Sequence, residues 1–188
     1  MNKSLLLRAL AIPRHISRKI EILAIKKFYG MNLILNKGIH ISSPLGIQLH
    51  ERGKLEIGSN TIIEKEGILN IQGSCKIGSN GYFSVRFLLG CSKSVIIGNN
   101  AAVGPNVVIV DTNKNYSNFS LPIAVQGEKS IGIKVGADCW IGANSVLLPG
   151  TVLGNHVVVG AGSVVRGVFP DNVMIAGSPA KILRVLDL

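Results

Sequence analysis

Apolar residues recur every six positions along much of this chain, and that spacing limits the possible folds more than any other feature. After residue 131 the interval is strict, through Val135, Ile141, Leu147, Leu153, Val159 and Val165. A period of six fits neither an α-helix, which repeats every 3.6 residues, nor a strand alone, which repeats every two. It fits a short strand and a turn, repeated, with one apolar side chain per unit pointing inward.

The first half of the chain shows the same repeat with a longer coil. The stretches KLEIGSN, SCKIGSN and SVIIGNN place Ile57, Ile77 and Ile97 at intervals of 20 residues. Because three units make a coil of about 18 residues, this interval is interpreted as one coil with two extra turn residues. Gly or Asn after the inward residue suits a tight turn with positive φ. The pattern predicts an all-β solenoid over residues 35–177. A β-sandwich is the alternative, but its strands would alternate with period two.

The ten residues VDTNKNYSNF, at positions 110–119, interrupt this repeat. They are mostly polar, and none of them is a His. A polar insertion between stacked coils predicts a loop, residues 110–130, that leaves the solenoid and protrudes. Binding and catalytic side chains concentrate on loops of this kind, because a rigid scaffold positions them.

Positive charge is concentrated near the start of the chain. The formal net charge is +10, and seven basic residues fall within residues 1–30 against a single acidic one. One helical face after Pro13 carries four residues of this segment: Ile16, Ile20, Leu23 and Lys27. We expect residues 1–34 to form a basic helical segment at the N-terminus. This segment either caps the open end of the solenoid or rests on an anionic membrane surface.

Composition excludes several function classes. Hydrophobic residues make up 47% of the chain and charged residues 16%, which suits one folded domain and not a disordered chain. The repeats lack a basic stripe interleaved with aromatics, so no nucleic-acid partner is expected. Three cysteines, Cys75, Cys91 and Cys139, without C-x-x-C spacing predict neither a disulfide framework nor a metal site. This cysteine usage favours a reduced, cytoplasmic compartment, with the inner membrane face as an alternative. No apolar stretch reaches the length of a membrane span.

The turn units IGSN, VGPN, VGAD, IGAN and LGNH resemble the hexapeptide repeat of left-handed β-helix acyltransferases. The run WIGANSVLLPGTVLGNHVVVGAGSVV, followed by IAGSPAKILR, resembles the C-terminal half of the sugar and polysaccharide O-acetyltransferases of that family. The resemblance covers about residues 35–185. It implies left-handed coils, against the usual crossover handedness, a homotrimer, and acetyl transfer from acetyl-CoA to a sugar hydroxyl. Residues 178–188 are expected to be a C-terminal extension with a short helix.

The resemblance implies that the chemistry takes place at the loop. The acceptor hydroxyl loses a proton as it attacks the thioester, and the family uses a loop His as base because its pKa lies near neutrality. Laid on VDTNKNY without gaps, that His position falls on Lys114. A Lys must first lose its own proton to act as a base. Lys114 is therefore a candidate catalytic residue, a cation for an acidic acceptor or a CoA phosphate, or an altered position in a slow protein.

Further site residues follow by position. Asp111, Asn113 and Tyr116 are expected to contact the acceptor, although Asp and Asn also serve ordinary loop turns. The resemblance implies that CoA lies in a groove between two subunits, with small residues along the pantetheine arm and cations near the phosphates. The residues that match those family positions are Trp140, Gly142, Ala143, Ala161, Arg166, Lys181 and Arg184.

Other interpretations remain open at this point. A non-catalytic relative that binds CoA or sugar is favoured by the absence of the loop His. A metal-dependent carbonic anhydrase of the same solenoid type needs three His around zinc, and none occurs between residues 60 and 155. An ice-binding solenoid needs regular Thr arrays, which are absent. His156, in LGNHVV, is expected at a solvent-facing turn.

Overall fold

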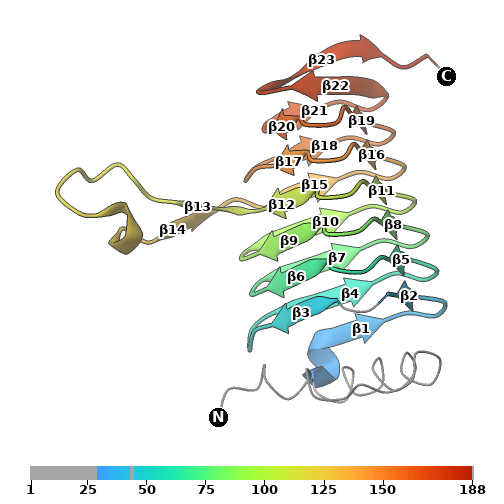
Figure 1. Cartoon of the computed structure of the whole chain (residues 1–188), viewed down its shortest axis with the longest axis horizontal. Helices are drawn as coiled ribbons and strands as arrows, with labels where there is room; N and C mark the ends of the chain where they lie inside the picture. Colours follow the sequence, from blue (N-terminus) through green and yellow to red (C-terminus); the bar gives the residue numbers. More distant parts are fainter. Residues whose placement is uncertain (1–28, 43–44, 188) are drawn as a thin grey trace.

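The chain forms a β-solenoid of about seven turns in the computed structural model, which describes residues 29–42 and 45–187. Figure 1 shows the coils stacked along one axis, with a long hairpin projecting from one side. The helix expected over residues 14–28 lies outside the described residues. A 3-10 turn, η2 (Gly30–Asn32), leads into the first strand, which begins two residues before the expected position 35. No helix in the described part of the chain is long and apolar enough to span a membrane.

Three parallel sheets form the sides of the solenoid. Sheet A contains β1 (Leu33–Leu35), β4 (Lys54–Ile57), β7 (Ser74–Ile77), β10 (Ser94–Ile97), β15 (Ile133–Val135), β18 (Val152–Leu153) and β21 (Val168–Phe169). Sheet B contains β2 (His40–Ile41), β5 (Ile62–Ile63), β8 (Tyr82–Phe83), β11 (Ala102–Val103), β16 (Trp140–Ile141), β19 (Val158–Val159), β22 (Val173–Gly177) and the antiparallel β23 (Ala180–Val185). Sheet C contains β3 (Gly46–Leu49), β6 (Ile68–Ile71), β9 (Leu88–Cys91), β12 (Val108–Val110), β17 (Val146–Leu147) and β20 (Val164–Val165). The chain passes from A to B to C in each coil, so we name the turns the AB, BC and CA corners.

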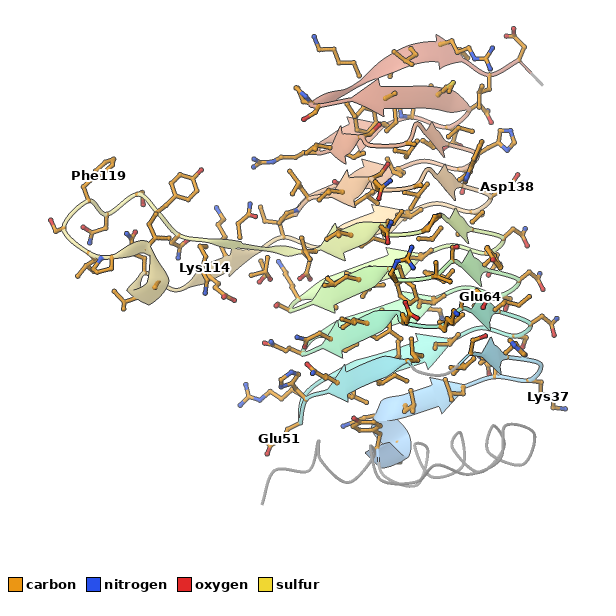
Figure 2. The ribbon with its side chains drawn as sticks, in the orientation of Figure 1. Lys37, Glu51, Glu64, Lys114, Phe119 and Asp138 are labelled. Atoms are coloured by element: carbon orange, nitrogen blue, oxygen red, sulfur yellow. The ribbon has the colours of Figure 1, made fainter. Side chains whose placement is uncertain are left out.

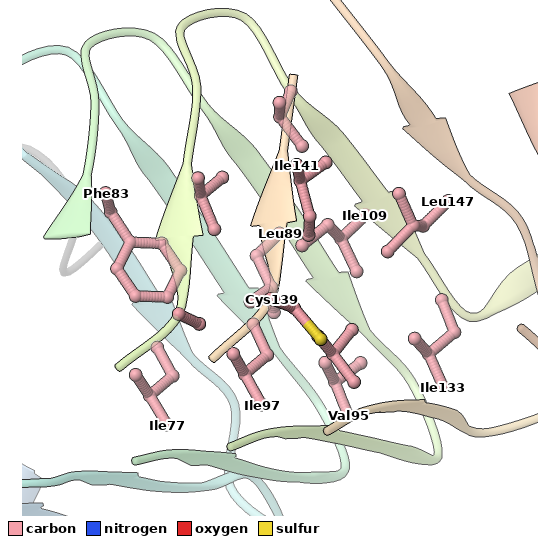
Figure 3. Packing of buried hydrophobic residues seen from close by; sticks show 14 of the residues in the cluster. Ile77, Phe83, Leu89, Val95, Ile97, Ile109, Ile133, Cys139, Ile141 and Leu147 are labelled. Atoms are coloured by element: carbon pink, nitrogen blue, oxygen red, sulfur yellow. The ribbon is translucent and has the colours of Figure 1, made fainter. Parts of the chain in front are cut away.

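The predicted six-residue interval is confirmed by the core. The six residues of the predicted interval after the hairpin are each at most 1% exposed: Val135, Ile141, Leu147, Leu153, Val159 and Val165. The earlier coils repeat every 20 residues, since Ile77 is the Cα partner of both Ile57 and Ile97. Figure 3 shows part of this core, with Ile77, Ile97, Ile141 and Leu147 packed between the sheets. The two extra residues lie between the inward residues of sheets C and A and lengthen the strands of both sheets, not the turns, because β6 and β7 each have two buried positions where β17 and β18 have one.

The predicted turn chemistry is confirmed at the AB corner for Asn but is wrong for Gly. Gly58, Gly78 and Gly98, which directly follow the inward residues, do not have positive φ; they are required because a Cβ there would lie 2.4–2.6 Å from backbone atoms of the next coil. Asn60, Asn80 and Asn100 adopt φ of 58°, 57° and 59°, a left-handed conformation that Asn tolerates better than most residues. Their side chains stack in a ladder, with Asn60 Nδ2 donating to Asn80 Oδ1 at 3.4 Å and Asn80 Nδ2 to Asn100 Oδ1 at 3.2 Å. The corner therefore satisfies part of its own hydrogen bonding from coil to coil.

The expected C-terminal helix is wrong. Residues 180–185 form β23, which pairs antiparallel with β22 from Gly177↔Ala180 to Val173↔Val185. The last coil has no further coil above it, so the free edge of β22 would otherwise remain unpaired. The chain turns back at Ser178 and Pro179 and satisfies that edge, which a helix could not do.

Buried thiols make the stability of the solenoid sensitive to alkaline pH. Burial, with the nearby charge of Asp111 second, raises the pKa of Cys91 to about 12. An unfolded thiol titrates near 8.5, so stability is unaffected below that pH and falls as pH rises from there toward 12, by about 1.4 kcal/mol per pH unit. We expect wild type to lose roughly 2 kcal/mol more than Cys91→Val between pH 8 and pH 10 in urea unfolding. Parallel losses in both proteins would contradict this.

Candidate functional site

The hairpin is anchored by Asp111, which stands at an inward position of the core. Asp111 is 0% exposed. It directly follows β12, at the register position that Ile71 and Cys91 hold as the last residues of β6 and β9 below. Its carboxylate accepts hydrogen bonds from the backbone N–H groups of Ser92 at 2.7 Å, Lys93 at 2.8 Å and Ser94 at 2.8 Å. One coil lower, the carbonyl oxygen of Cys91 accepts from residues 72 and 73. Where the chain leaves the coil, the carboxylate therefore replaces a backbone acceptor.

Residues 111–131 form the projecting segment, which we call the arm. It contains β13 (Thr112–Lys114), β14 (Glu128–Ser130) and the 3-10 turn η3 (Ile123–Val125). Thr112 lies opposite Ser130 with their hydroxyl oxygens 2.7 Å apart, and the N–H of Ile131 donates to the carbonyl of Asp111 at 2.8 Å. These four residues join the two strands where the arm leaves the coil, and we call this point the root of the arm. The predicted protruding loop is thus a two-stranded arm at the CA corner.

Lys114 stands on the arm, in register with Glu128. Its Nζ lies 2.5 Å from Glu128 Oε1, and the two side chains are 54% and 46% exposed. Figure 2 shows Lys114 and Phe119 on the arm, clear of the coils. An ammonium group has no lone pair with which to accept a proton. Within one chain, this environment is that of an exposed ion pair.

The end of the arm is free of charge and rich in exposed apolar side chains. Residues 115–127 include no Asp, Glu, Lys or Arg, while Tyr116 is 70% exposed, Phe119 99% and Val125 65%. Gln126 holds its shape, since the side-chain amide donates to the carbonyls of Asn118 and Leu121, both at 2.8 Å. Residues 115–127, which we call the tip of the arm, therefore present an ordered apolar surface that no other described part of the same chain covers.

Most of the expected cofactor residues lie together on sheet B and the BC corner. Cα register runs from Trp140 to Val158, Met174 and Arg184 across four neighbouring strands, so Trp140 and Arg184 share one row. Trp140 is 57% exposed. Lys181 pairs with Ala176 at the BC end of the same sheet.

Small residues occupy the two upper turns of the BC corner. Ala143 and Ala161 lie in successive turns, and the N–H of Gly162 donates to the carbonyl of Ala143 at 2.8 Å. Gly142 is required there, because a Cβ would lie 2.6 Å from the backbone N of Ala161. In the coils below, the same corner holds Glu66 and Arg86 at positive φ. The upper turns of the BC corner therefore have small side chains where the lower turns have long charged ones, so the backbone of the upper turns lies closer to the surface.

Two groups of predicted residues do not meet in one chain. Arm residues Asn113, Lys114 and Tyr116 project from the CA corner, whereas Trp140, Ala143 and Ala161 lie on sheet B and the BC corner. Arg166 follows β20 and lies near the CA corner, apart from the other expected cofactor residues. The structure thus places the predicted acceptor residues of the arm and most of the predicted cofactor residues at two different edges.

His156 lies at an AB-corner turn with φ of 55°, as expected. Its Nδ1 is 2.8 Å from Asp138 Oδ2, and the two side chains are 43% and 61% exposed. Figure 2 shows Asp138 on the side of the solenoid away from the arm. Within residues 29–42 and 45–187, no three His, Cys, Asp or Glu side chains cluster as metal ligands would.

The sequence analysis did not predict the anchoring role of Asp111. The signal available was its place 20 residues after Cys91.

Comparison with known proteins identifies the repeats. The family described as bacterial transferase hexapeptide (six repeats) matches residues 132–167. A candidate lipopolysaccharide biosynthesis O-acetyl transferase of Escherichia coli (strain K12), WbbJ, is 29% identical over 186 residues, which is 95% of this chain and 86% of that protein. The galactoside O-acetyltransferase of the same strain is 30% identical over 139 residues. That match takes in 70% of this chain and less than two thirds, 64%, of the relative.

Solved structures share the architecture. A point mutant of the N-acyltransferase AntD from Bacillus cereus, in complex with dTDP and coenzyme A, superposes with a TM-score of 0.74 at 23% identity, covering 88% of this chain and 89% of AntD. A galactoside acetyltransferase in complex with coenzyme A has a TM-score of 0.62 at 22% identity, over 94% of this chain and 74% of that one. Likeness at this level of identity shows the fold.

Proposed function

Because this chain belongs to the hexapeptide-repeat acyltransferase family, we propose that it is an acetyl-CoA-dependent O-acetyltransferase of a sugar hydroxyl in glycan or polysaccharide biosynthesis. The observation that carries the proposal is the row from Trp140 to Arg184 beside the small upper BC corner. An exposed indole, an accessible backbone and two cations, Lys181 and Arg184, are what the adenine, the pantetheine amides and the phosphates of CoA require. The relatives named for sugar O-acetylation support the acceptor class.

We propose further that the working unit is a homotrimer with left-handed coils, as the family resemblance implies, working in the cytoplasm or at the inner membrane face. Two features of one chain support an assembly. The arm and the cofactor face lie at different edges, so a composite site requires a second copy. The uncharged tip around Phe119, 99% exposed, is a surface that association would cover. CoA would then lie in the groove between two copies, with Arg166 and the arm supplied from one side.

The role of Lys114 separates two versions of this function. If its ammonium stays paired with Glu128, the chain binds CoA and acceptor, but the acceptor hydroxyl lacks a proton acceptor at the usual position. Asn113 and Tyr116 then position the sugar, and the transfer is slow. If the partner copy or another cation pairs with Glu128 instead, Lys114 is released from its ion pair and is the candidate base. The alternative function is therefore a CoA- and sugar-binding relative with impaired catalysis.

The first test is calorimetric titration with CoA, followed by release of free thiol from acetyl-CoA in the presence of a sugar panel. Binding with turnover supports the transferase. Binding without turnover on any acceptor supports the impaired relative. Absence of CoA binding by the folded protein contradicts the proposal in both versions.

Arg184→Ala is expected to weaken CoA binding by about tenfold, because a charge-assisted contact to phosphate is worth about 1.5 kcal/mol. Dephospho-CoA, which lacks the 3′-phosphate, shows which phosphate is involved. If Arg184 contacts the 3′-phosphate, wild type should bind CoA more tightly than dephospho-CoA, and Arg184→Ala should bind the two equally. Lys37→Ala, which removes an exposed charge from the first coil, serves as the control. Equal losses in both variants would point to net charge instead of a contact.

A further inference from the structure

The CA corner below the arm contains a depression that no part of the proposed function uses. It is shallow, with a volume of about 500 Å³, and its lining side chains are His50, Glu51, Arg52, Gln72 and Ser92. Every one of them is polar. Figure 2 shows Glu51 at the same edge of the solenoid as the arm, several coils below it.

Register connects this depression to the arm. His50, Gln72 and Ser92 each follow the last residue of a sheet C strand, and those strands pair Leu49 with Ile71 and Ile71 with Cys91. The next residue in this column is Thr112, the first residue of β13. Neighbouring strands are about 4.8 Å apart, so the column rises about 14 Å from His50 to Thr112. Polar side chains therefore run without a break from the first coil to the root of the arm.

The chemistry of the lining suits a polyol. A sugar hydroxyl both donates and accepts hydrogen bonds, and the depression offers donors and acceptors side by side. Arg52 supplies only donors, Glu51 only acceptors, and Gln72 and Ser92 supply both. His50 is oriented by Asn70, whose Oδ1 lies 3.0 Å from Nε2. Among the described residues, no apolar residue lines the depression, which argues against an acyl chain or a nucleobase as the occupant.

We propose that this depression holds the distal sugar residues of an oligosaccharide acceptor whose reacting end lies at the root of the arm. The inference rests on the proposed function and deepens it, because it makes the acceptor a short chain of sugars and not a free monosaccharide. The reacting sugar lies beside Thr112 and Asn113, and the chain runs down the column toward Gln72, His50 and Arg52. Affinity then grows with acceptor length until the depression is filled.

The test measures binding and does not depend on turnover. Maltotriose, mannotriose and N-acetylchitotriose are compared with glucose, mannose and N-acetylglucosamine by calorimetry on the full chain saturated with CoA. At least one trisaccharide should bind about tenfold more tightly than its monosaccharide, as two or three added hydrogen bonds allow. Arg52→Ala and Gln72→Ala should each weaken that trisaccharide by roughly fivefold and leave the monosaccharide unchanged. Lys37→Ala, at another corner of the first coil, should change neither.

Two results would overturn the inference while the proposed function stands. In one, CoA binds and every trisaccharide binds no better than its monosaccharide. In the other, a trisaccharide binds better, but Arg52→Ala and Gln72→Ala leave its affinity unchanged. Failure of the proposed function has a different signature, because the folded protein would then not bind CoA in the first titration.

Discussion

Asp111→Ala should destabilise this protein by about 3–5 kcal/mol, more than any other single change in the arm. The substitution removes the acceptor of three backbone N–H groups, at 2.7, 2.8 and 2.8 Å, at a position that is 0% exposed. Water cannot replace that acceptor without opening the core, so the N–H groups of residues 92–94 would remain unsatisfied. The melting temperature should fall by roughly 10 °C, and the amide protons of Ser92 and Ser94 should exchange faster than those of the coils above.

Two variants test the assigned cause. Asp111→Asn keeps one carbonyl oxygen but turns an NH₂ group toward backbone donors, so it should lie between wild type and Asp111→Ala. Glu56→Ala removes a carboxylate from the outer face of β4, where it pairs with Lys76 at 3.3 Å, and should cost no more than about 0.5 kcal/mol. An Asp111→Ala protein that melts within a degree or two of Glu56→Ala would show that the carboxylate does not anchor the arm.

Lys114→His should raise the rate of acetyl transfer by about 10²–10⁴-fold, the range of general-base catalysis. The new imidazole would stand in register with Glu128, and a carboxylate beside a His fixes its orientation and supports the cation that forms. The measurement is release of free CoA from acetyl-CoA with each sugar acceptor, for wild type and variant side by side. The gain should follow the loss of the imidazole proton, so it appears as pH rises through about 6.5.

Lys114→Gln is the matched control, because it removes the charge without supplying a base. A gain shared by Lys114→Gln and Lys114→His would mean that the ammonium blocks the acceptor and that proton transfer is handled elsewhere. If wild type already turns over as fast as Lys114→His at neutral pH, the gapless alignment of the loop or the requirement for a His is wrong. Unchanged CoA affinity in all three proteins would confirm that only the chemical step is affected.

The arm and the cofactor face could be predicted to different extents. The loss of the six-residue interval after Val110 located the arm, since an uninterrupted solenoid would have continued to bury an apolar residue there. Trp140 and Arg184 are 44 positions apart in the chain, and matching to a family indicated their common role. Asp111 was expected to face the acceptor, but its buried position follows from vertical register with Cys91, which loop composition does not reveal. The depression at the CA corner joins residues from three coils, and no local pattern marks it.

The six-residue repeat is sufficient to specify the solenoid, because each unit carries its own inward residue and its own turn residue. Those are local requirements, and a periodic chain satisfies them in every coil. The places where the repeat ends or is interrupted depend instead on the stacking of coils. The free edge above the last coil selected strand β23 over a helix, and the gap left by the arm required the carboxylate of Asp111. Both features supply hydrogen-bond partners to backbone groups that would otherwise be unpaired. They therefore depend on which coils stack above and below, and not on the adjacent sequence.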